Sequence, residues 1–473
     1  MSSTMNGLNG AGLEKTRNDT IKRSLVIREL CSSPLAAPIW PATIPCMNTL
    51  CITGGRIIDP SQGIDQIAEL WIRGENILGI GPQPQLKADQ TIDAAGLIVC
   101  PGLIDMHVHL REPGREEDET IETGTAAALA GGVTSVACMP NTEPALDSQA
   151  AAEFVYLQAE RAGNANVFPI GAITKGRKGE ELAEIGGLVE GGAVAFTDDG
   201  TPVMNAEIMR RAFEYCKMFD RVVMDHCEDL ELTRGGVMHE GVESMRLGLR
   251  GMPAAAEEVM VSRNIILAEM TGGRLHILHA STAGSVDLIR RGKERGIHVT
   301  GECCPHHFTL TDECLRAFDS NFKMSPPLRT KHDVDAIIAG LKDGTIDVIA
   351  TDHAPHAPEK KMRELDQAPN GIIGLETLVP ICVVSLIEPG HLTWPKLIEK
   401  LTINPARILG IDRGTLKPGA DADVTILNPK AEWVIDPAKF KSKSRNCPFD
   451  GWKVRGRAEV VIVGGEVRYQ VEG

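Results

Sequence analysis

The sequence predicts an α/β protein: a (β/α)8 TIM-like barrel with a small β-sandwich domain built from both flanks of the chain. After residue 103, apolar strand-like runs alternate with helix-compatible segments such as ETIETGTAAALAGG, which is the pattern of a parallel sheet. Eight such strands can be counted, and eight is the number that closes a barrel. On both sides of this region the chain has short β-runs with Gly and Pro turns and few helical segments.

The 473 residues are enough for a barrel of about 250 residues or more together with a second module. The N-terminal segment is rich in Ser, Asn, Ala and Pro and has no basic start followed by an apolar run, so it does not resemble a secretory signal. The alternatives to a disordered extension are a start codon placed before Met47 and an organelle transit peptide, against which the mixture of acids and bases argues. The predicted parts are a disordered extension over residues 1–46, the first part of the β-sandwich over 47–98, the metal-dependent barrel over 99–411 and the second part of the β-sandwich over 412–473.

Composition limits the partners of the chain. Hydrophobic residues make up 42% and charged residues 24%, and no window approaches the roughly 18 to 20 apolar residues of a membrane span. The net charge of −15 argues against nucleic acid as a partner and favours a small-molecule substrate. Twelve cysteines occur without a C-x-x-C pair, and Cys100, Cys138 and Cys382 lie in apolar runs, which is typical of a cytoplasmic protein.

The predicted strands place titratable residues where a barrel carries its chemistry, at the carboxyl ends of the strands. In chain order the strands end at His109 and at VTSVACMPN, NVFPIGAIT, GAVAFTDDG, RVVMDHCED, RLHILHAST, HVTGECCPHH and DVIATDHAPH. The titratable residues at these ends are His107, His109, Asp198, Asp199, Asp225, His226, His279, Asp352, His353 and His356.

The first of these strands runs into GLIDMHVHLREPG, residues 102–114. Side chains at i, i+2 and i+4 of an extended segment point the same way, so His107, His109 and Arg111 share one face. A His-x-His pair alone is as often structural as functional, so the prediction of a site depends on the other strand ends.

Strand parity selects among neighbouring residues, because inward-facing and outward-facing positions alternate. In GAVAFTDDG this favours Asp199 over Asp198 as the inward residue, and in DVIATDHAPH it favours Asp352 over His353. His276 falls on the face opposite His279 and is predicted to be structural. The same prediction applies to His239, His298, His332 and His391.

Four imidazoles and two carboxylates are a suitable ligand set for zinc, and six ligands exceed what one catalytic zinc uses. We therefore expect two Zn²⁺ ions per subunit, bridged by a carboxylate. Such a pair lowers the pKa of a water held between the ions toward about 7 and so supplies a hydroxide that can attack an amide-like bond. Asp352 is the candidate that takes the proton and returns it to the leaving nitrogen. The predicted ligands are His107, His109, Asp199, His226, His279 and Asp352.

Arg111 points to an acidic substrate, because its planar fork of donors matches a carboxylate. The alternative is a surface ion pair with Glu112 or Glu116. Asn141 in MPNTEP can donate to the same substrate carboxylate.

Seven motifs, in order, resemble the dihydroorotases of the larger bacterial type (class I) in the amidohydrolase superfamily, and the likeness runs from about residue 48 to 470. The motifs are GLIDMHVHLREPG, GGVTSVACMPNTEP, AFTDDG, DHCED, KMSPPLR, IATDHAPH and GIIGLET. The resemblance implies reversible cyclisation of N-carbamoyl-L-aspartate to dihydroorotate, with loss of water, in pyrimidine synthesis. It also implies a homodimer or a complex with aspartate transcarbamoylase.

By this likeness, His107 and His109 hold one zinc, His226 and His279 hold the other, Asp199 bridges them, and Asp352 is both ligand and proton shuttle. The substrate-binding residues that it implies are His109, Arg111, Asn141, Ser325, His356, Asn370 and Gly371. Two positions depart from the family pattern. Ser325 stands where Asn is usual and loses two amide donors, and Asn370 stands where Phe is more usual. The polar run EKKMRELDQAPNG, residues 359–371, is the expected lid.

Two other functions share this barrel. Hydantoinases and allantoinases resemble it but use a carboxylated lysine as the metal bridge, whereas FTDDG has no lysine. A metal-free relative that only acts as a scaffold for aspartate transcarbamoylase would be expected to lose ligands, and every expected ligand is present here.

Overall fold

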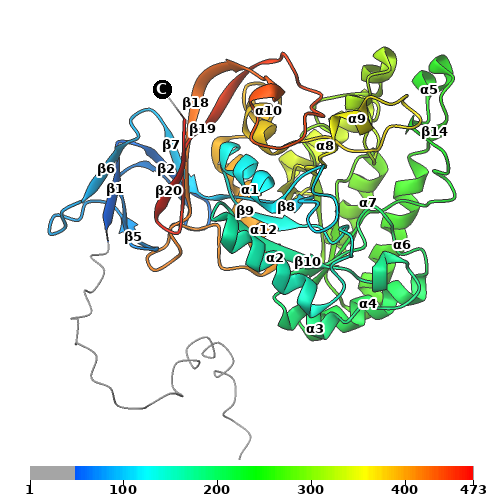
Figure 1. The fold of residues 1–473 in the computed structure, drawn as a ribbon, viewed down its shortest axis with the longest axis horizontal. Coiled ribbons are helices and arrows are strands. Elements are labelled where there is room, and N and C mark those ends of the chain that lie inside the picture. Colours follow the sequence, from blue (N-terminus) through cyan, green and yellow to red (C-terminus); the bar gives the residue numbers. More distant parts are fainter. Residues whose placement is uncertain (1–47, 472–473) are drawn as a thin grey trace, which may run out of the picture. The chain divides into compact units, whose positions relative to one another are not determined.

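An eight-stranded parallel sheet forms the centre of the computed structural model, which describes residues 48–471 (Figure 1). Each strand pairs with its neighbours in chain order, and a backbone hydrogen bond of 2.9 Å from His109 N to the His353 carbonyl closes the barrel. The strands are β8 (Leu103–Val108), β9 (Val133–Cys138), β10 (Asn166–Gly171), β11 (Ala195–Phe196), β12 (Val222–Asp225), β15 (Leu275–Ile277), β16 (Val299–Cys303) and β17 (Val348–Ile349). All eight predicted strands are confirmed. The predicted extension over residues 1–46 lies outside the described residues.

Helices follow the barrel strands and cover them from outside. The helices are α1 (Ile121–Ala130), α2 (Gln149–Ala162), α3 (Ile185–Glu190), α4 (Ala206–Met218), α5 (Val242–Leu247), α6 (Ala255–Thr271), α7 (Ala283–Glu294), α8 (Lys331–Asp343), α9 (Pro358–Lys361), α10 (Leu378–Cys382), α11 (Trp394–Leu401) and α12 (Ile403–Leu409). In residues 48–471, no helix has both the length and the apolar character needed to cross a membrane.

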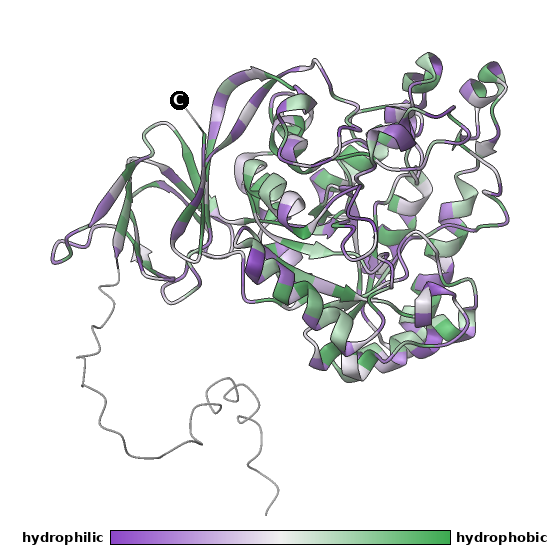
Figure 2. Cartoon of the chain, in the orientation of Figure 1, coloured by the Kyte–Doolittle hydropathy of each residue, from purple (hydrophilic) through white to green (hydrophobic). Residues whose placement is uncertain are grey.

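Helix α4 illustrates why these segments are helical. The Asn205 side chain caps its first turn by accepting hydrogen bonds from two backbone N–H groups. Met209, Ala212, Phe213 and Cys216 are buried at helical spacing and form one face, whereas the charged residues of α4 face solvent. Figure 2 shows the same division across the barrel, with hydrophobic strands inside and hydrophilic colour on the outer helices.

One end of the barrel interior is filled by an apolar cluster. It includes Met106, Ala137, Ile170, Met224 and Val348 from the strands and Leu278 directly after β15, with Ile408 and Leu409 of α12. Because this end is packed with apolar side chains, the polar chemistry is confined to the other end of the barrel, at the carboxyl ends of the strands.

The two flanks of the chain meet in a β-sandwich, as predicted. A four-stranded sheet has the order β5-β4-β1-β6, and a six-stranded sheet has the order β20-β19-β18-β7-β2-β3. The strands are β1 (Thr49–Thr53), β2 (Arg56–Asp59), β3 (Ile64–Ile67), β4 (Leu70–Arg73), β5 (Asn76–Ile80), β6 (Gln90–Asp93), β7 (Ile98–Pro101), β18 (Val424–Val434), β19 (Lys453–Val463) and β20 (Glu466–Gln470).

Strands β7 and β18 run antiparallel and join the two flanks, so that the blue and orange-red strands of Figure 1 lie side by side. One buried cluster, which includes Leu50, Ile72, Val99, Ile426 and Ile462, holds the sandwich together. Strand β7 crosses the predicted limit between residues 98 and 99, because it belongs to the sandwich sheet and leads directly into β8. The limits 47–98, 99–411 and 412–473 stay predictions.

Candidate metal centre

Six side chains from five strand ends gather at the open end of the barrel. Their ligand atoms form three overlapping groups, and within each group the atoms lie within 4.8 Å of one another. The groups are His107, His109 and Asp199; His107, His279 and Asp352; and Asp199, His226 and His279. Asp199 belongs to two of these groups. It lies between His107 and His109, in and just after β8, and the pair that follows β12 and β15.

The carboxylates face the imidazole nitrogens at close range. Asp199 Oδ1 is 3.6 Å from His107 Nε2, 3.5 Å from His226 Nδ1 and 3.6 Å from His279 Nε2, while its Oδ2 is 3.5 Å from His109 Nε2. Asp352 Oδ1 is 3.0 Å from His109 Nε2 and 3.5 Å from His107 Nε2. All six side chains are buried.

The donor set fits a metal of the zinc class. His107 Nε2 and Asp199 Oδ1 are buried and have no hydrogen-bond partner. His226 Nδ1 and His279 Nε2 face each other at 2.9 Å. Buried polar atoms are rarely left without partners, and a cation among these nitrogen and oxygen atoms would satisfy them.

The outer nitrogens of three histidines contact acceptors that orient the rings. His107 Nδ1 lies 2.6 Å from Glu302, His109 Nδ1 lies 2.8 Å from Asn141 Oδ1, and His226 Nε2 lies 2.9 Å from Glu228. Such contacts are usual for metal-ligating histidines.

Sequence reasoning missed Glu302 and Glu228. The available signals were the acid inside the strand HVTGEC and the one two residues after His226 in DHCED.

The neighbours that strand parity set aside lie outside the cluster. Asp198 accepts hydrogen bonds from the backbone of residues 173 and 174, and His353 contacts Glu119 at 3.3 Å. His276 contacts Thr300 at 2.8 Å, and its other nitrogen contacts Glu302 at 3.1 Å. Parity therefore predicts correctly which carboxylates join the histidines.

The electrostatics of the cluster favour ionised carboxylates. Burial alone raises the pKa of Asp199, but His107 and the other histidines that lie 3.5 to 3.6 Å from the carboxylate bring that pKa well below its usual range. The pKa of Asp352 is also lowered, because the effects of His107 and His109 outweigh burial. Both groups are therefore charged near neutral pH.

Arg111 lies beside the cluster and is 4% exposed. Its Nε donates to the Pro355 carbonyl at 3.2 Å, and within residues 48–471 no carboxylate oxygen forms an ion pair with its guanidinium. Burial and the nearby Arg115 lower the pKa of Arg111 to about 10. The alternative surface pairing is not found, because Glu112 accepts from the Ile121 N–H and Glu116 is directed to the Gly114 N–H.

A cavity of about 290 Å³ opens onto the cluster. All of the predicted substrate-binding residues line it: His109, Arg111, Asn141, Ser325, His356, Asn370 and Gly371. The cavity therefore brings together five of the six cluster residues, a buried cation without an acidic partner, and several polar groups.

Several of these groups have partners within the protein. The Asn370 carbonyl is 2.7 Å from His356 Nε2, and the Gly371 N–H donates to the Lys323 carbonyl at 3.0 Å. Ser325 Oγ donates to Glu228 at 2.9 Å. A substrate contact to these groups would therefore require them to exchange partners.

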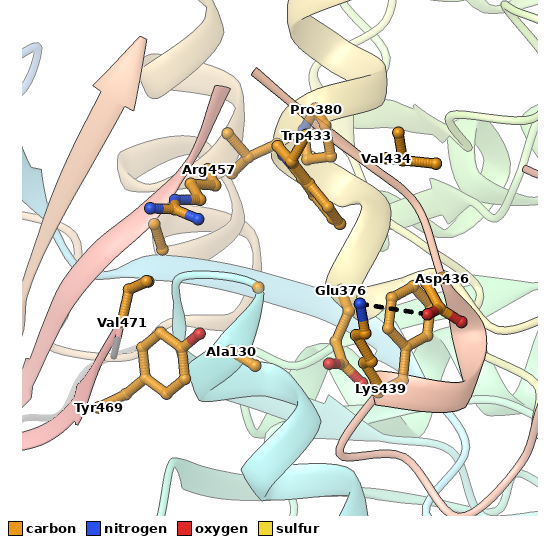
Figure 3. Close-up of a pocket in the computed structure, with 14 residues that line it drawn as sticks. Ala130, Glu376, Pro380, Trp433, Val434, Asp436, Lys439, Arg457, Tyr469 and Val471 are labelled. Carbon is orange, nitrogen blue, oxygen red and sulfur yellow. Dashed lines mark ion pairs between the residues drawn. The ribbon is translucent and has the colours of Figure 1, made fainter. Parts of the chain in front are cut away.

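A second cavity, of about 440 Å³, lies between the sandwich and helices α1 and α10 (Figure 3). Trp433 and Pro380 line it together with Lys439 and Asp436, which form an ion pair of 3.4 Å. No candidate metal group in residues 48–471 lies in its lining, so it is not the candidate for the chemistry.

Known proteins share this sequence and fold. A family model described as Dihydro-orotase-like matches residues 96–285. A dihydroorotase of Geobacter metallireducens is 54% identical over 425 residues, which cover 90% of this chain and 100% of the relative. A dihydroorotase of Pelotomaculum thermopropionicum is 55% identical over 421 residues, which cover 89% of this chain and 98% of the relative.

Among solved structures, the L-hydantoinase (dihydropyrimidinase) from Arthrobacter aurescens is similar with a TM-score of 0.81 and 25% identity. The match covers 90% of this chain and 96% of that one. The fold is thus shared with hydantoinases, while sequence identity over nearly the whole length is twice as high with the dihydroorotases. By sequence and by fold, this chain belongs to the dihydroorotase family of the amidohydrolases.

Proposed function

We propose that the chain is a dihydroorotase, which interconverts N-carbamoyl-L-aspartate and (S)-dihydroorotate in de novo pyrimidine synthesis. One observation carries the proposal: a buried His/Asp cluster and a buried arginine without an acidic partner line the same cavity. The first feature suits hydrolysis of an amide, and the second suits a substrate that carries a carboxylate. The dihydroorotases at 54% and 55% identity support it.

The proposed cofactor is two zinc ions per subunit. His107 and His109 would hold one, His226 and His279 the other, and Asp199 would lie between them with Asp352 alongside. Ions bound there supply Lewis acidity and lower the pKa of a water in the cavity. The unpartnered His107 Nε2 and Asp199 Oδ1 support this assignment.

Asp352 is the proposed catalytic acid and base. The lowered pKa keeps this buried carboxylate ionised, which is the form that can accept a proton when water attacks the ring amide carbon. It then returns that proton to the ring nitrogen as the C–N bond breaks and N-carbamoyl-aspartate forms. In the direction of ring closure the same proton moves back and water leaves.

Arg111 and Asn141 are the proposed partners of the substrate carboxylate. Asn141 uses its carbonyl oxygen toward His109, which leaves its NH₂ group to donate. Within residues 48–471, the Arg111 guanidinium forms one hydrogen bond, from Nε, so its remaining N–H donors can form a two-point contact with a carboxylate. His356 also lines the cavity.

The test measures metal content by elemental analysis and ring-opening rates on dihydroorotate and hydantoin, before and after chelation. We expect dihydroorotate to be strongly preferred, and we expect its turnover to disappear on chelation and return with zinc. Full turnover after exhaustive metal removal would refute the metal mechanism. Faster turnover of hydantoin would replace this function with that of a hydantoinase, whose fold the chain shares.

We also propose that the protein works in the cytoplasm as a homodimer or in a complex with aspartate transcarbamoylase. In residues 48–471, nine of ten free cysteines are buried, which suits a reducing compartment. Sedimentation of the purified chain, alone and with the transcarbamoylase, distinguishes the two assemblies.

A further inference from the structure

A second group of potential metal ligands lies in the turn that follows β16. Cys304, His306 and His307 offer ligand atoms within 4.8 Å of one another, and none of them belongs to the His/Asp cluster. All three side chains are fully or almost fully buried. The turn is closed by a 2.9 Å hydrogen bond from the His307 N–H to the Cys304 carbonyl, which brings the three side chains together.

Two ring nitrogens in this turn are buried without a partner. His306 Nε2 and His307 Nδ1 have no hydrogen-bond partner in residues 48–471. His307 Nε2 lies 3.0 Å from the Pro326 carbonyl, which can only accept, so Nε2 carries the hydrogen. The Nδ1 atom of His307 therefore has a lone pair and no donor to satisfy it, and its ring is oriented by a backbone carbonyl as in metal-ligating histidines.

The Cys304 side chain is fully buried, and burial, with Asp352 and Glu302 nearby, raises the pKa of its thiol well above the usual value. A bound cation would offset these effects and hold the thiolate. Ligands on a tetrahedral zinc are about 3.3 to 3.6 Å apart, given bonds of about 2.0 to 2.3 Å, so the three atoms need to approach only by small side-chain rotations. One thiolate and two imidazoles form a set that suits zinc or cobalt.

We infer that Cys304, His306 and His307 form a third metal site, which takes a zinc-class divalent ion in addition to the ions of the His/Asp cluster. The site is linked to the substrate cavity through His307. Its hydrogen-bond partner Pro326 is the next residue after Ser325, and Ser325 lines the cavity. An ion here holds the 304–307 turn against the 325–326 turn and so positions one wall of the cavity.

Thiolate ligation gives the site its own signature. In residues 48–471, Cys304 is the only cysteine in any candidate metal group, and the His/Asp cluster offers only nitrogen and oxygen. The full-length protein is loaded with Co²⁺, and its near-ultraviolet absorption and bound metal per chain are measured. We expect three ions per chain and a thiolate-to-cobalt charge-transfer band.

The Cys304→Ser variant should bind two ions and lose the band. The matched control is Cys303→Ser, which removes the adjacent buried thiol outside the group. This variant should still bind three ions and keep the charge-transfer band. His307→Gln, which retains an amide donor for Pro326, should also bind only two ions. A Cys304→Ser variant that folds and binds as many ions as the parent would overturn the inference.

X-ray absorption at the zinc edge of the unmodified protein decides the question even if the variants fail to fold. A sulfur shell at about 2.3 Å supports the site. Its absence in protein saturated with zinc overturns the inference and leaves buried water as the partner of the two ring nitrogens. The cobalt measurements and the X-ray absorption do not depend on turnover. If the protein binds the third ion but has no dihydroorotase activity, the proposed function is refuted and the third metal site is not.

Discussion

Replacing Arg111 with Met should weaken binding of the acidic substrate without destabilising the fold. The guanidinium is 4% exposed and, within residues 48–471, forms no ion pair with a carboxylate. The proposed two-point contact with the substrate carboxylate would therefore be its only strong pairing within the described residues. A desolvated, hydrogen-bonded charge pair of this kind contributes about 2 to 4 kcal/mol, which corresponds to a roughly 30- to 700-fold loss in kcat/KM, mostly through KM.

The same substitution removes a buried cation that the free protein does not neutralise. Burial and the nearby Arg115 lower the pKa of Arg111 to about 10. Relative to an ordinary value above 12, the surroundings in the folded protein disfavour the charge by about 3 kcal/mol. Met has a similar length and no charge, so the apparent Tm of Arg111→Met should equal or exceed that of the parent.

The assay compares ring opening of dihydroorotate with that of dihydrouracil, which is the same ring without the carboxylate. Arg111→Met should lose activity only on dihydroorotate. As a control, Arg290→Met breaks an exposed ion pair of 2.9 Å with Asp343 and should change neither substrate. Equal losses on both rings, an unchanged KM for dihydroorotate or a clearly lower Tm would each refute the reasoning.

Three further predictions concern other groups. Asp352→Asn should abolish turnover with little loss of bound metal, because five of the six cluster residues remain; retained activity would place the proton shuttle elsewhere. Glu302→Gln should weaken metal binding about 10- to 100-fold, measured in competition with a chelator, because Glu302 orients His107. The control Asp198→Asn changes a buried carboxylate outside the cluster and should leave metal binding unchanged. Burial and Lys323 lower the pKa of Lys361 to about 7. The folded state therefore binds the Lys361 proton more weakly than the unfolded state does. As a result, the free energy of unfolding of the parent protein rises with pH above 7. The Tm of the parent relative to that of Lys361→Met should therefore rise between pH 7 and pH 10, and a constant difference would contradict this reasoning.

The sequence predicts the barrel and the cluster well because both follow from local rules. Strand ends converge in a barrel whatever the loops do, and alternation along a strand selects Asp199 over Asp198 and Asp352 over His353. The joining of the two flanks was also predictable, because neither flank has a helix to cover its apolar strand faces.

Contacts that depend on pairs distant in sequence could not be predicted. Glu302 is 195 residues from His107, and only the folded barrel brings them together. The environment of Gly371 depends on Lys323 and Lys361, which bind backbone carbonyls of residues 366–371 and hold the predicted lid segment in place. Side-chain chemistry identifies candidates for such roles, but the partners come from the tertiary fold.

The pairing of β7 with β18 also has a consequence for synthesis on the ribosome. Strand β7 ends at Pro101 and its partner begins at Val424, more than 300 residues later. At 5 to 20 residues per second, the first half of the sandwich waits roughly a quarter of a minute to a minute for the second. During that time Ile57 and Val99 are not yet covered by the C-terminal strands, so the nascent N-terminal strands can aggregate. Cellular yield should therefore be most sensitive to substitutions near the last strands translated.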